Sequence, residues 1–180
     1  MFAAFRDRAG FLKTLIVRAR PGKPQQGVLQ AGPVRLPCAL GRGGISARKR
    51  EGDGATPLAA MAVLGGYATG RCFASGLALR RTRTDDGWCD APGDRNYNRP
   101  VRLPYSGSTE AMKRPDGLYD ACLVLGWNIA PRRRACGSAI FLHLARPGYA
   151  PTEGCIALSR AGMAWLLPRI RRGTVIKVVL

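Results

Sequence analysis

The chain has 180 residues, of which 46% are hydrophobic, so it is long enough to bury one core and is not disordered as a whole. Its 23 glycines and 13 prolines leave few stretches with sustained helical periodicity, which favours a β-rich fold with many turns. The 29 Lys and Arg residues exceed the 11 Asp and Glu residues and give a net charge of +18.

The positive charge is carried mostly by arginine, because only five of the basic residues are lysine. A guanidinium group holds carboxylates and phosphates with two parallel hydrogen bonds, so the composition suits an anionic polymer as partner. Nucleic acid and a carboxylate-rich cell-wall polymer both meet that description. An arginine-biased genome explains the excess equally well, so the charge alone does not choose among these interpretations.

From the sequence we expect no membrane-spanning segment, no signal peptide and no metal site. No run of 18 apolar residues exists to span a membrane, and Arg6, Asp7 and Arg8 interrupt the apolar stretch that a signal peptide needs. The cysteines show no Cys-x-x-Cys spacing and the chain has one histidine, so we expect no metal site. We predict that five of the six cysteines are structural thiols: Cys38, Cys72, Cys89, Cys122 and Cys136.

The first half of the chain reads mainly as strands. Residues 1–12 are expected to be a loose leader, and 12–22 a strand that ends at Pro-Gly. Residues 27–44 read as a hairpin that turns near Gly32-Pro33, followed by a turn and an apolar stretch of ambiguous type over 47–67. Alternation over 72–84 predicts a further strand. Residues 85–107 lack periodicity and are predicted to form a long ordered loop.

The second half contains the expected centre of the sheet. Ser108 reads as the cap of a helix of one or two turns over 108–114. The apolar runs 117–128 and 137–144 are predicted to be central strands. Ser159 can cap a helix that Pro168 bends and basic residues end, and 174–180 reads as a closing strand. No domain boundary is visible, so we expect one domain over 13–180.

The segment "SAIFLHLARPGYAPTEGCIAL" carries the candidate catalytic residues. His143, the only histidine, ends an apolar strand, and Cys155 follows Gly154 after a loop. A lone histidine is more often a core residue, and a buried cysteine is more often a small hydrophobic residue than a nucleophile. Here Gly154 allows a substrate carbonyl to approach, and backbone amides near a following helix would lower the thiol pKa and hold an oxyanion. This pattern is typical of a Cys-His acyl transferase or hydrolase.

The same residues resemble the active-site signature of the L,D-transpeptidase catalytic domain family (YkuD-type): a His, a loop and then Ser/Thr-x-Gly-Cys. The segments "GRGGISARKREGDGATP", "LYDACLVLGWN" and "GSAIFLH" are similar to the early strand and central strands of that family, so the resemblance covers about 34–180. Where the family has His before Gly-Cys and a polar residue two places after Cys, this chain has Glu153 and Ala157.

The resemblance implies a mainly β, sandwich-like fold (α+β) with one helix after the catalytic Cys, and a cysteine-dependent L,D-transpeptidase that cross-links peptidoglycan stem peptides. Cys155 would be the nucleophile and His143 the base and acid, with the amides of Gly154 and Cys155 holding the oxyanion. No metal or organic cofactor is implied. The implied location is the cell envelope or periplasm, and a monomer is expected.

Other roles stay open at this stage. Thr152 supplies a hydroxyl beside the site, and Arg146 and Tyr149 are either carboxylate-binding or solvated loop residues. Glu153 either orients His143 or faces water. Asn96, Tyr97 and Asn98 are candidates to line the cleft. A hydrolase that cuts an L,D bond in stem peptides uses the same catalytic residues, and a non-enzymatic nucleic-acid-binding module explains the charge but not the His-Cys pair.

Overall fold

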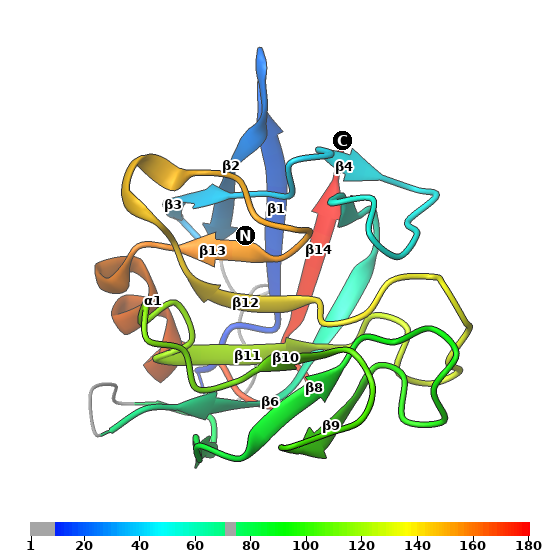
Figure 1. The fold of residues 1–180 in the computed structure, drawn as a ribbon. Helices are drawn as coiled ribbons and strands as arrows, with labels where there is room; N and C mark the ends of the chain where they lie inside the picture. The colour runs from blue at the N-terminus through cyan, green and yellow to red at the C-terminus, as the bar shows by residue number, and fades with distance from the viewer. Residues whose placement is uncertain (1–9, 71–74) are drawn as a thin grey trace.

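The computed structural model describes residues 10–70 and 75–180, which are mainly β (Figure 1). The longer strands are β1 (Thr14–Arg20), β2 (Lys23–Ala31), β3 (Val34–Ala39), β6 (Ala60–Ala68), β11 (Ala121–Leu125), β12 (Phe141–Leu144) and β14 (Val175–Val179). The shorter strands are β4 (Ile45–Ser46), β5 (Thr56–Pro57), β7 (Leu79–Arg81), β8 (Asp86–Cys89), β9 (Arg99–Arg102), β10 (Thr109–Ala111) and β13 (Ile156–Leu158). The helical segments are η2 (Pro147–Tyr149), α1 (Arg160–Leu166) and η3 (Leu167–Arg169).

The main sheet closes on itself. Its strands follow the order β11-β12-β13-β3-β2-β1-β14-β6-β7. The first strand, β11, also pairs with β6, so the strands from β11 to β6 form a closed ring and β7 extends from β6. Neighbours are antiparallel except for the parallel pairs β1–β14, β12–β13 and β6–β7. The walls of the closed sheet face each other across one core, so the expected mainly β architecture with one helix after Cys155 is confirmed.

Alternation of apolar residues places the main core inside the closed sheet. In β1, Leu15 and Val17 are buried whereas Arg18 and Arg20 are exposed, as the period of two in a strand requires. Helix α1, the η3 turn and the residue that follows it add four buried side chains to this core: Met163, Leu166, Leu167 and Ile170.

A second apolar cluster covers the outer face of β6, β11 and β12. Leu123 and Leu142 face the main core, whereas Cys122 and Phe141, on the opposite face of their strands, belong to the second cluster. The small antiparallel sheet β10-β8-β9 lies against this face and contributes Trp88 (Figure 1). β11 and β12 are therefore buried on both faces, which explains why their sequences are continuously apolar.

Several predicted elements are confirmed. The strand over 12–22 ends at the Pro21-Gly22 turn, and the hairpin of β2 and β3 turns at Gly32-Pro33. The apolar runs 117–128 and 137–144 contain β11 and β12. Ser159 caps α1, because its Oγ accepts a hydrogen bond from the Gly162 amide at 3.0 Å. The helix is shorter than expected, because a 3-10 turn containing Pro168 follows Leu166.

Other predicted elements are wrong. Residues 85–107 hold β8 and β9 rather than a loop throughout, and 108–114 holds β10 rather than a helix. β10 pairs with β8 in the register Glu110↔Trp88, and this long-range pairing outweighs the local helix signal at Ser108. Of the predicted strand 72–84, only β7 is formed in the described part, and 71–74 lie outside it. Residues 1–9 of the expected leader also lie outside the described residues, whereas Leu12 packs in the main core.

Candidate active site

His143 and Cys155 lie on the same face of two adjacent strands. Leu142 and Leu144 face the main core, so the pleat of β12 turns His143 to the outer face. The neighbouring β13 is parallel, with Ala157 paired to His143, and Cys155 precedes it with the same outward parity. The structure therefore brings the two predicted catalytic residues to one face of the sheet. They lie on neighbouring segments, and Cys155 precedes by two residues the position that pairs with His143.

The Cys155 thiol is buried and fully engaged in this structure. Its Sγ donates a hydrogen bond to the Ala139 carbonyl at 3.1 Å and accepts one from the Phe141 amide at 3.3 Å. Burial raises the pKa of the Cys155 thiol to about 12, and the nearby carboxylate of Glu110 adds to the rise. The expected lowering of this pKa by a helix terminus is wrong, because β13 follows the cysteine and α1 begins only at Arg160.

The His143 ring is held as a neutral base. Burial lowers its pKa to about 4. Its Nδ1 lies 2.8 Å from the Leu144 carbonyl oxygen, and a carbonyl can only accept, so we assign the ring proton to Nδ1. This tautomer leaves Nε2 unprotonated and able to take a proton. The Tyr119 ring packs edge-on against the imidazole with centroids 5.1 Å apart and restricts its orientation.

The segment before the cysteine is anchored by hydrogen bonds. Thr152 Oγ1 donates to the Cys155 carbonyl at 2.6 Å and accepts from the Gly154 amide at 3.2 Å. The Thr152 amide donates a hydrogen bond to the Leu40 carbonyl at 2.9 Å, and the Thr152 carbonyl accepts one from the Arg42 amide at 2.8 Å. Gly154 has a φ of +129°, and a Cβ there would lie 2.8 Å from the Ala55 carbonyl oxygen, so this approach requires glycine.

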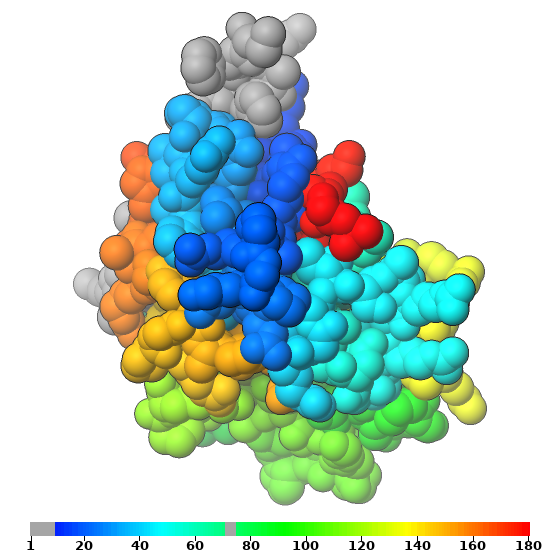
Figure 2. All heavy atoms as spheres, turned by 90° about the horizontal axis from the view of Figure 1, so that it is seen from above, coloured from blue at the N-terminus to red at the C-terminus, as the bar shows by residue number. Residues whose placement is uncertain are grey.

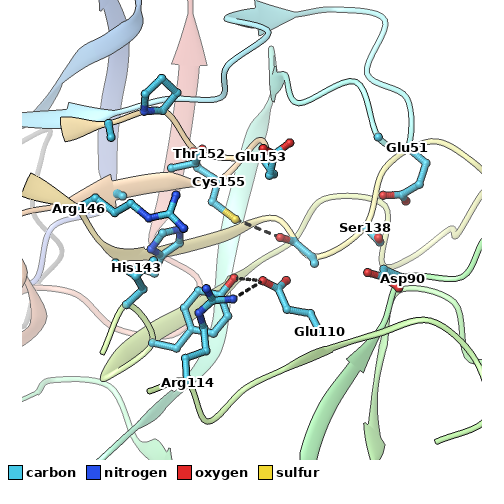
Figure 3. A pocket seen from close by; sticks show the side chains of 17 residues that line it. Glu51, Asp90, Glu110, Arg114, Ser138, His143, Arg146, Thr152, Glu153 and Cys155 are labelled. Carbon is cyan, nitrogen blue, oxygen red and sulfur yellow. Dashed lines mark hydrogen bonds and ion pairs between the residues drawn. The ribbon is translucent and has the colours of Figure 1, made fainter. Parts of the chain in front are cut away.

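A cavity of about 210 Å³ opens beside the thiol and the imidazole (Figure 3). Three of the four residues predicted to contact substrate line it, namely Thr152, Arg146 and Glu153, whereas Tyr149 does not. The Glu153 side chain is 77% exposed and forms an ion pair with Arg42 at 2.6 Å, so it faces solvent and does not orient His143. Near this mouth, the loop after β12 lies against the β2 segment, where Gln26 donates to the Gly148 carbonyl (Figure 2).

Residues 96–98 do not line the cavity, but Tyr97 and Asn98 form hydrogen bonds with residues that do. The Asn98 side-chain oxygen accepts hydrogen bonds from Trp88 Nε1 and from the Ala139 amide, both at 3.0 Å. Ala139, whose carbonyl accepts the hydrogen bond of the Cys155 thiol, is thereby linked through Asn98 to Trp88 of the small sheet. The Tyr97 hydroxyl donates a hydrogen bond to the carboxylate of Glu51, which does line the cavity.

Sequence reasoning missed a polar cluster next to His143. The Tyr119 hydroxyl donates to Glu110 Oε1 at 2.5 Å, and the Arg114 guanidinium lies 3.5 Å from the same carboxylate and 5.1 Å from the centroid of the Tyr119 ring. Burial raises the pKa of both Glu110 and Tyr119. The polar stretch 108–114 contains Glu110 and Arg114, but its interpretation as a short helix gave no link between these residues and the site.

The residues that the structure describes contain neither a group of metal-ligating side chains nor a helix that could cross a membrane. In 10–70 and 75–180, no group of three His, Cys, Asp or Glu side chains is arranged to hold a metal ion. Within the same ranges no helix combines the length and apolar character that a membrane crossing needs. The described cysteines are all free thiols, and Cys72 lies outside the described residues.

Residues 24–179 match the family model of the YkuD L,D-transpeptidase catalytic domain. No curated protein gives a significant match to the chain.

Three solved structures are similar to the chain at low sequence identity. L,D-transpeptidase 1 of Mycobacterium tuberculosis is 17% identical, with a TM-score of 0.44 and coverage of 93% of this chain and 60% of that one. The LD transpeptidase LdtMt1 in complex with imipenem is 18% identical, with a TM-score of 0.43 and coverage of 92% and 58%. An L,D-transpeptidase from Mycobacterium smegmatis is 15% identical, with a TM-score of 0.43 and the same coverages. The chain thus spans about 60% of the length of the solved structures it matches.

Proposed function

Because this chain belongs to the L,D-transpeptidase catalytic domain family, we propose that it is a cysteine-dependent L,D-transpeptidase that cross-links peptidoglycan stem peptides. The observation that carries the proposal is the pairing of a buried thiol with a histidine whose Nε2 is free to accept a proton, on one face of adjacent strands and in one cavity. Both groups are neutral at rest, so the reaction begins from a thiol and an imidazole rather than from a preformed ion pair.

The first half-reaction forms a thioester. The Cys155 side chain turns from the Ala139 carbonyl toward His143, which takes the thiol proton at Nε2. The sulfur attacks the carbonyl carbon between the third residue of a tetrapeptide stem and its terminal D-alanine. The peptide bond breaks, and the imidazolium returns the proton to the leaving amine of D-alanine.

The second half-reaction transfers the acyl group. An amine of a second stem attacks the thioester carbonyl and gives its proton to His143, and the thiolate leaves and is then protonated again. If water replaced the amine, the same residues would perform hydrolysis, so the acceptor distinguishes the transpeptidase from the L,D-carboxypeptidase alternative. In both reactions Cys155 is the nucleophile and His143 is the base and acid.

We assign the oxyanion to backbone amides beside the nucleophile. The Gly154 amide donates to Thr152 Oγ1 in this structure, so the Cys155 amide is the first candidate donor and Gly154 joins it if the Thr152 contact opens. Arg146 and Arg114, both lining the cavity, supply positive charge for substrate carboxylates. The substrate implies action in the cell envelope.

Intact-protein mass spectrometry tests the proposal through the thioester. The protein is incubated with a soluble stem tetrapeptide and quenched in acid, and we expect an added mass equal to the tripeptide acyl group, located on Cys155. Cys155→Ala should give no adduct. Cys136→Ala is the matched control, because Cys136 is a half-buried thiol that does not line the cavity, and it should behave as the wild type. An adduct that persists in Cys155→Ala would refute the assignment.

A further inference from the structure

The acidic residues of the described chain are confined to its middle segment. No Asp or Glu occurs between residues 10 and 50, and none occurs after Glu153, although Lys and Arg occur throughout both segments. The fold brings these two segments together, because β1 pairs with β2 from the first segment and with β14 from the second. One wall of the closed sheet, formed by β3, β2, β1 and β14, is therefore built without acidic side chains.

The outer face of this wall carries basic and apolar side chains in two rows that cross all four strands. Leu15 and Val17 of β1 face the main core, so Ile16 and Arg18 lie on the outer face. Strand register gives the rows as Lys177–Ile16–Gln30–Arg35 and Val179–Arg18–Val28–Pro37. We call these eight residues the cationic face.

The basic side chains of the cationic face have no acidic partner in the protein. Arg18, Arg35 and Lys177 are exposed, and in 10–70 and 75–180 no carboxylate oxygen lies within 4.0 Å of their nitrogen atoms. Two more exposed cations, Arg20 and Lys23, lie where the β1–β2 hairpin projects from the body of the molecule (Figure 1). Apart from the terminal carboxylate after β14, this wall creates a purely positive potential, which attracts an anionic surface.

The cationic face lies opposite the candidate active site. In the ring of strands, β1 is four strands away from β12, the strand of His143, in either direction. In Figure 2 the blue segments of β1 and β2 and the red strand β14 lie on the other side of the molecule from the green segments, which contribute Asp90, Glu110 and Arg114 to the pocket. A partner bound to the cationic face would leave the pocket open.

The mixture of side chains on this face indicates what kind of partner it fits. A bilayer with anionic lipids offers a negative surface potential and, beneath it, an apolar boundary. Ile16, Val28 and Val179 are half-buried and lie next to the cations in the two rows, so they would meet this boundary when the cations meet the headgroups. A hydrated polyanion attracts the cations equally but gains nothing from the apolar side chains, and the face has no aromatic ring on which unpaired bases could stack.

We propose that the cationic face is a peripheral docking surface for a bilayer that contains anionic phospholipids. Arg18, Arg35 and Lys177 contact the headgroups, and the apolar side chains between them contact the interface below. Docking in this orientation holds the protein on the membrane with Cys155 and its pocket turned away from the lipid. The proposal goes beyond the proposed enzymatic function and does not depend on it.

Cosedimentation with vesicles tests the charges of this face. The vesicles are phosphatidylcholine alone or phosphatidylcholine with one third phosphatidylglycerol, and we expect the protein to bind only the second kind. Each basic residue near an anionic membrane changes the partition coefficient about fivefold, so the triple variant Arg18→Gln, Arg35→Gln and Lys177→Gln should bind about a hundredfold more weakly.

A second triple variant is the matched control. Arg48→Gln, Arg99→Gln and Arg134→Gln remove the same charge from exposed residues that form no ion pair in the described structure and do not belong to the cationic face. This variant should bind the anionic vesicles within about twofold of the wild type. Equal losses in the two triple variants would show an effect of net charge alone and would overturn the docking surface. An unchanged urea midpoint shows that each variant is folded.

The apolar side chains distinguish a bilayer from a polyanion. Ile16→Thr with Val28→Thr keeps every charge, and we expect it to weaken vesicle binding about tenfold while leaving binding to duplex DNA and to purified sacculi unchanged. If the first triple variant lost binding to DNA or sacculi but kept vesicle binding, the partner would be a hydrated polyanion and the membrane proposal would be refuted. Thioester formation with a soluble tetrapeptide should be unchanged in all these variants, so failure of docking and failure of the proposed function are observed separately.

Discussion

Substitution of Gly154 by alanine tests whether the close contact before the nucleophile positions Cys155. At the observed φ of +129°, a side chain costs about 1–3 kcal/mol of backbone strain. The added Cβ would lie 2.8 Å from the Ala55 carbonyl oxygen, a backbone atom that cannot rotate away, and such overpacking costs about 1–3 kcal/mol more. We therefore expect Gly154→Ala to lower the free energy of unfolding by about 2–6 kcal/mol.

Gly148→Ala is the control in the same loop, because it introduces backbone strain without a steric contact. Gly148 also has a positive φ, +69°, but a Cβ there meets no atom within 4 Å, so only about 1–2 kcal/mol of conformational cost is expected. Urea unfolding measures the stability of both variants. The rate of acylation of Cys155 by a carbapenem, a β-lactam class that is expected to acylate members of this family, measures the position of the thiol. That rate should fall by up to about a hundredfold in Gly154→Ala and stay near wild type in Gly148→Ala. Equal stability and equal rates in the two variants would refute the argument.

Five further outcomes are expected. Cys155→Ala should abolish both turnover and the carbapenem adduct, and an adduct on the variant would exclude Cys155 as nucleophile. Because burial lowers the pKa of His143 to about 4, the ring stays neutral at higher pH, and kcat/KM should fall only as the pH drops through about 4. A fall centred near the ordinary histidine pKa would contradict this. His143→Ala should lower turnover by about 10²–10⁴-fold, because the general base is lost. Thiol titration of the denatured, non-reduced protein should find all 6 cysteines free, and four or fewer would contradict the prediction. Raising the ionic strength should weaken binding to whole sacculi but leave the rate on a soluble tetrapeptide nearly unchanged, whereas equal suppression of both would place the charge effect at the catalytic site.

The parts of the fold that could be predicted from the sequence have local causes. The apolar run 15–17 lies shortly before the Pro21-Gly22 turn, and Gly32-Pro33 ends one strand before another begins, so β1 and the β2–β3 hairpin are visible in short windows. β10 could not be predicted, because it exists through pairing with β8 rather than through its own propensity.

The same distinction holds for the candidate site. His143 and Cys155 are close in sequence and embedded in one pattern, so their proximity could be predicted. Glu110, Tyr119 and Asp90 reach the pocket from separate segments with no shared period. The high pKa of the Cys155 thiol could not be predicted either, because it follows from burial within the second cluster, which the small sheet covers.

Mass spectrometry of the products formed from purified disaccharide tetrapeptides tests the central claim most directly. The protein is incubated with the muropeptide alone, and the products are separated and fragmented to locate the new bond. We predict a cross-linked dimer that has lost one D-alanine and that is absent with Cys155→Ala. Tripeptide without any dimer would show a hydrolase and contradict transfer, and an unchanged muropeptide would contradict the proposed activity altogether.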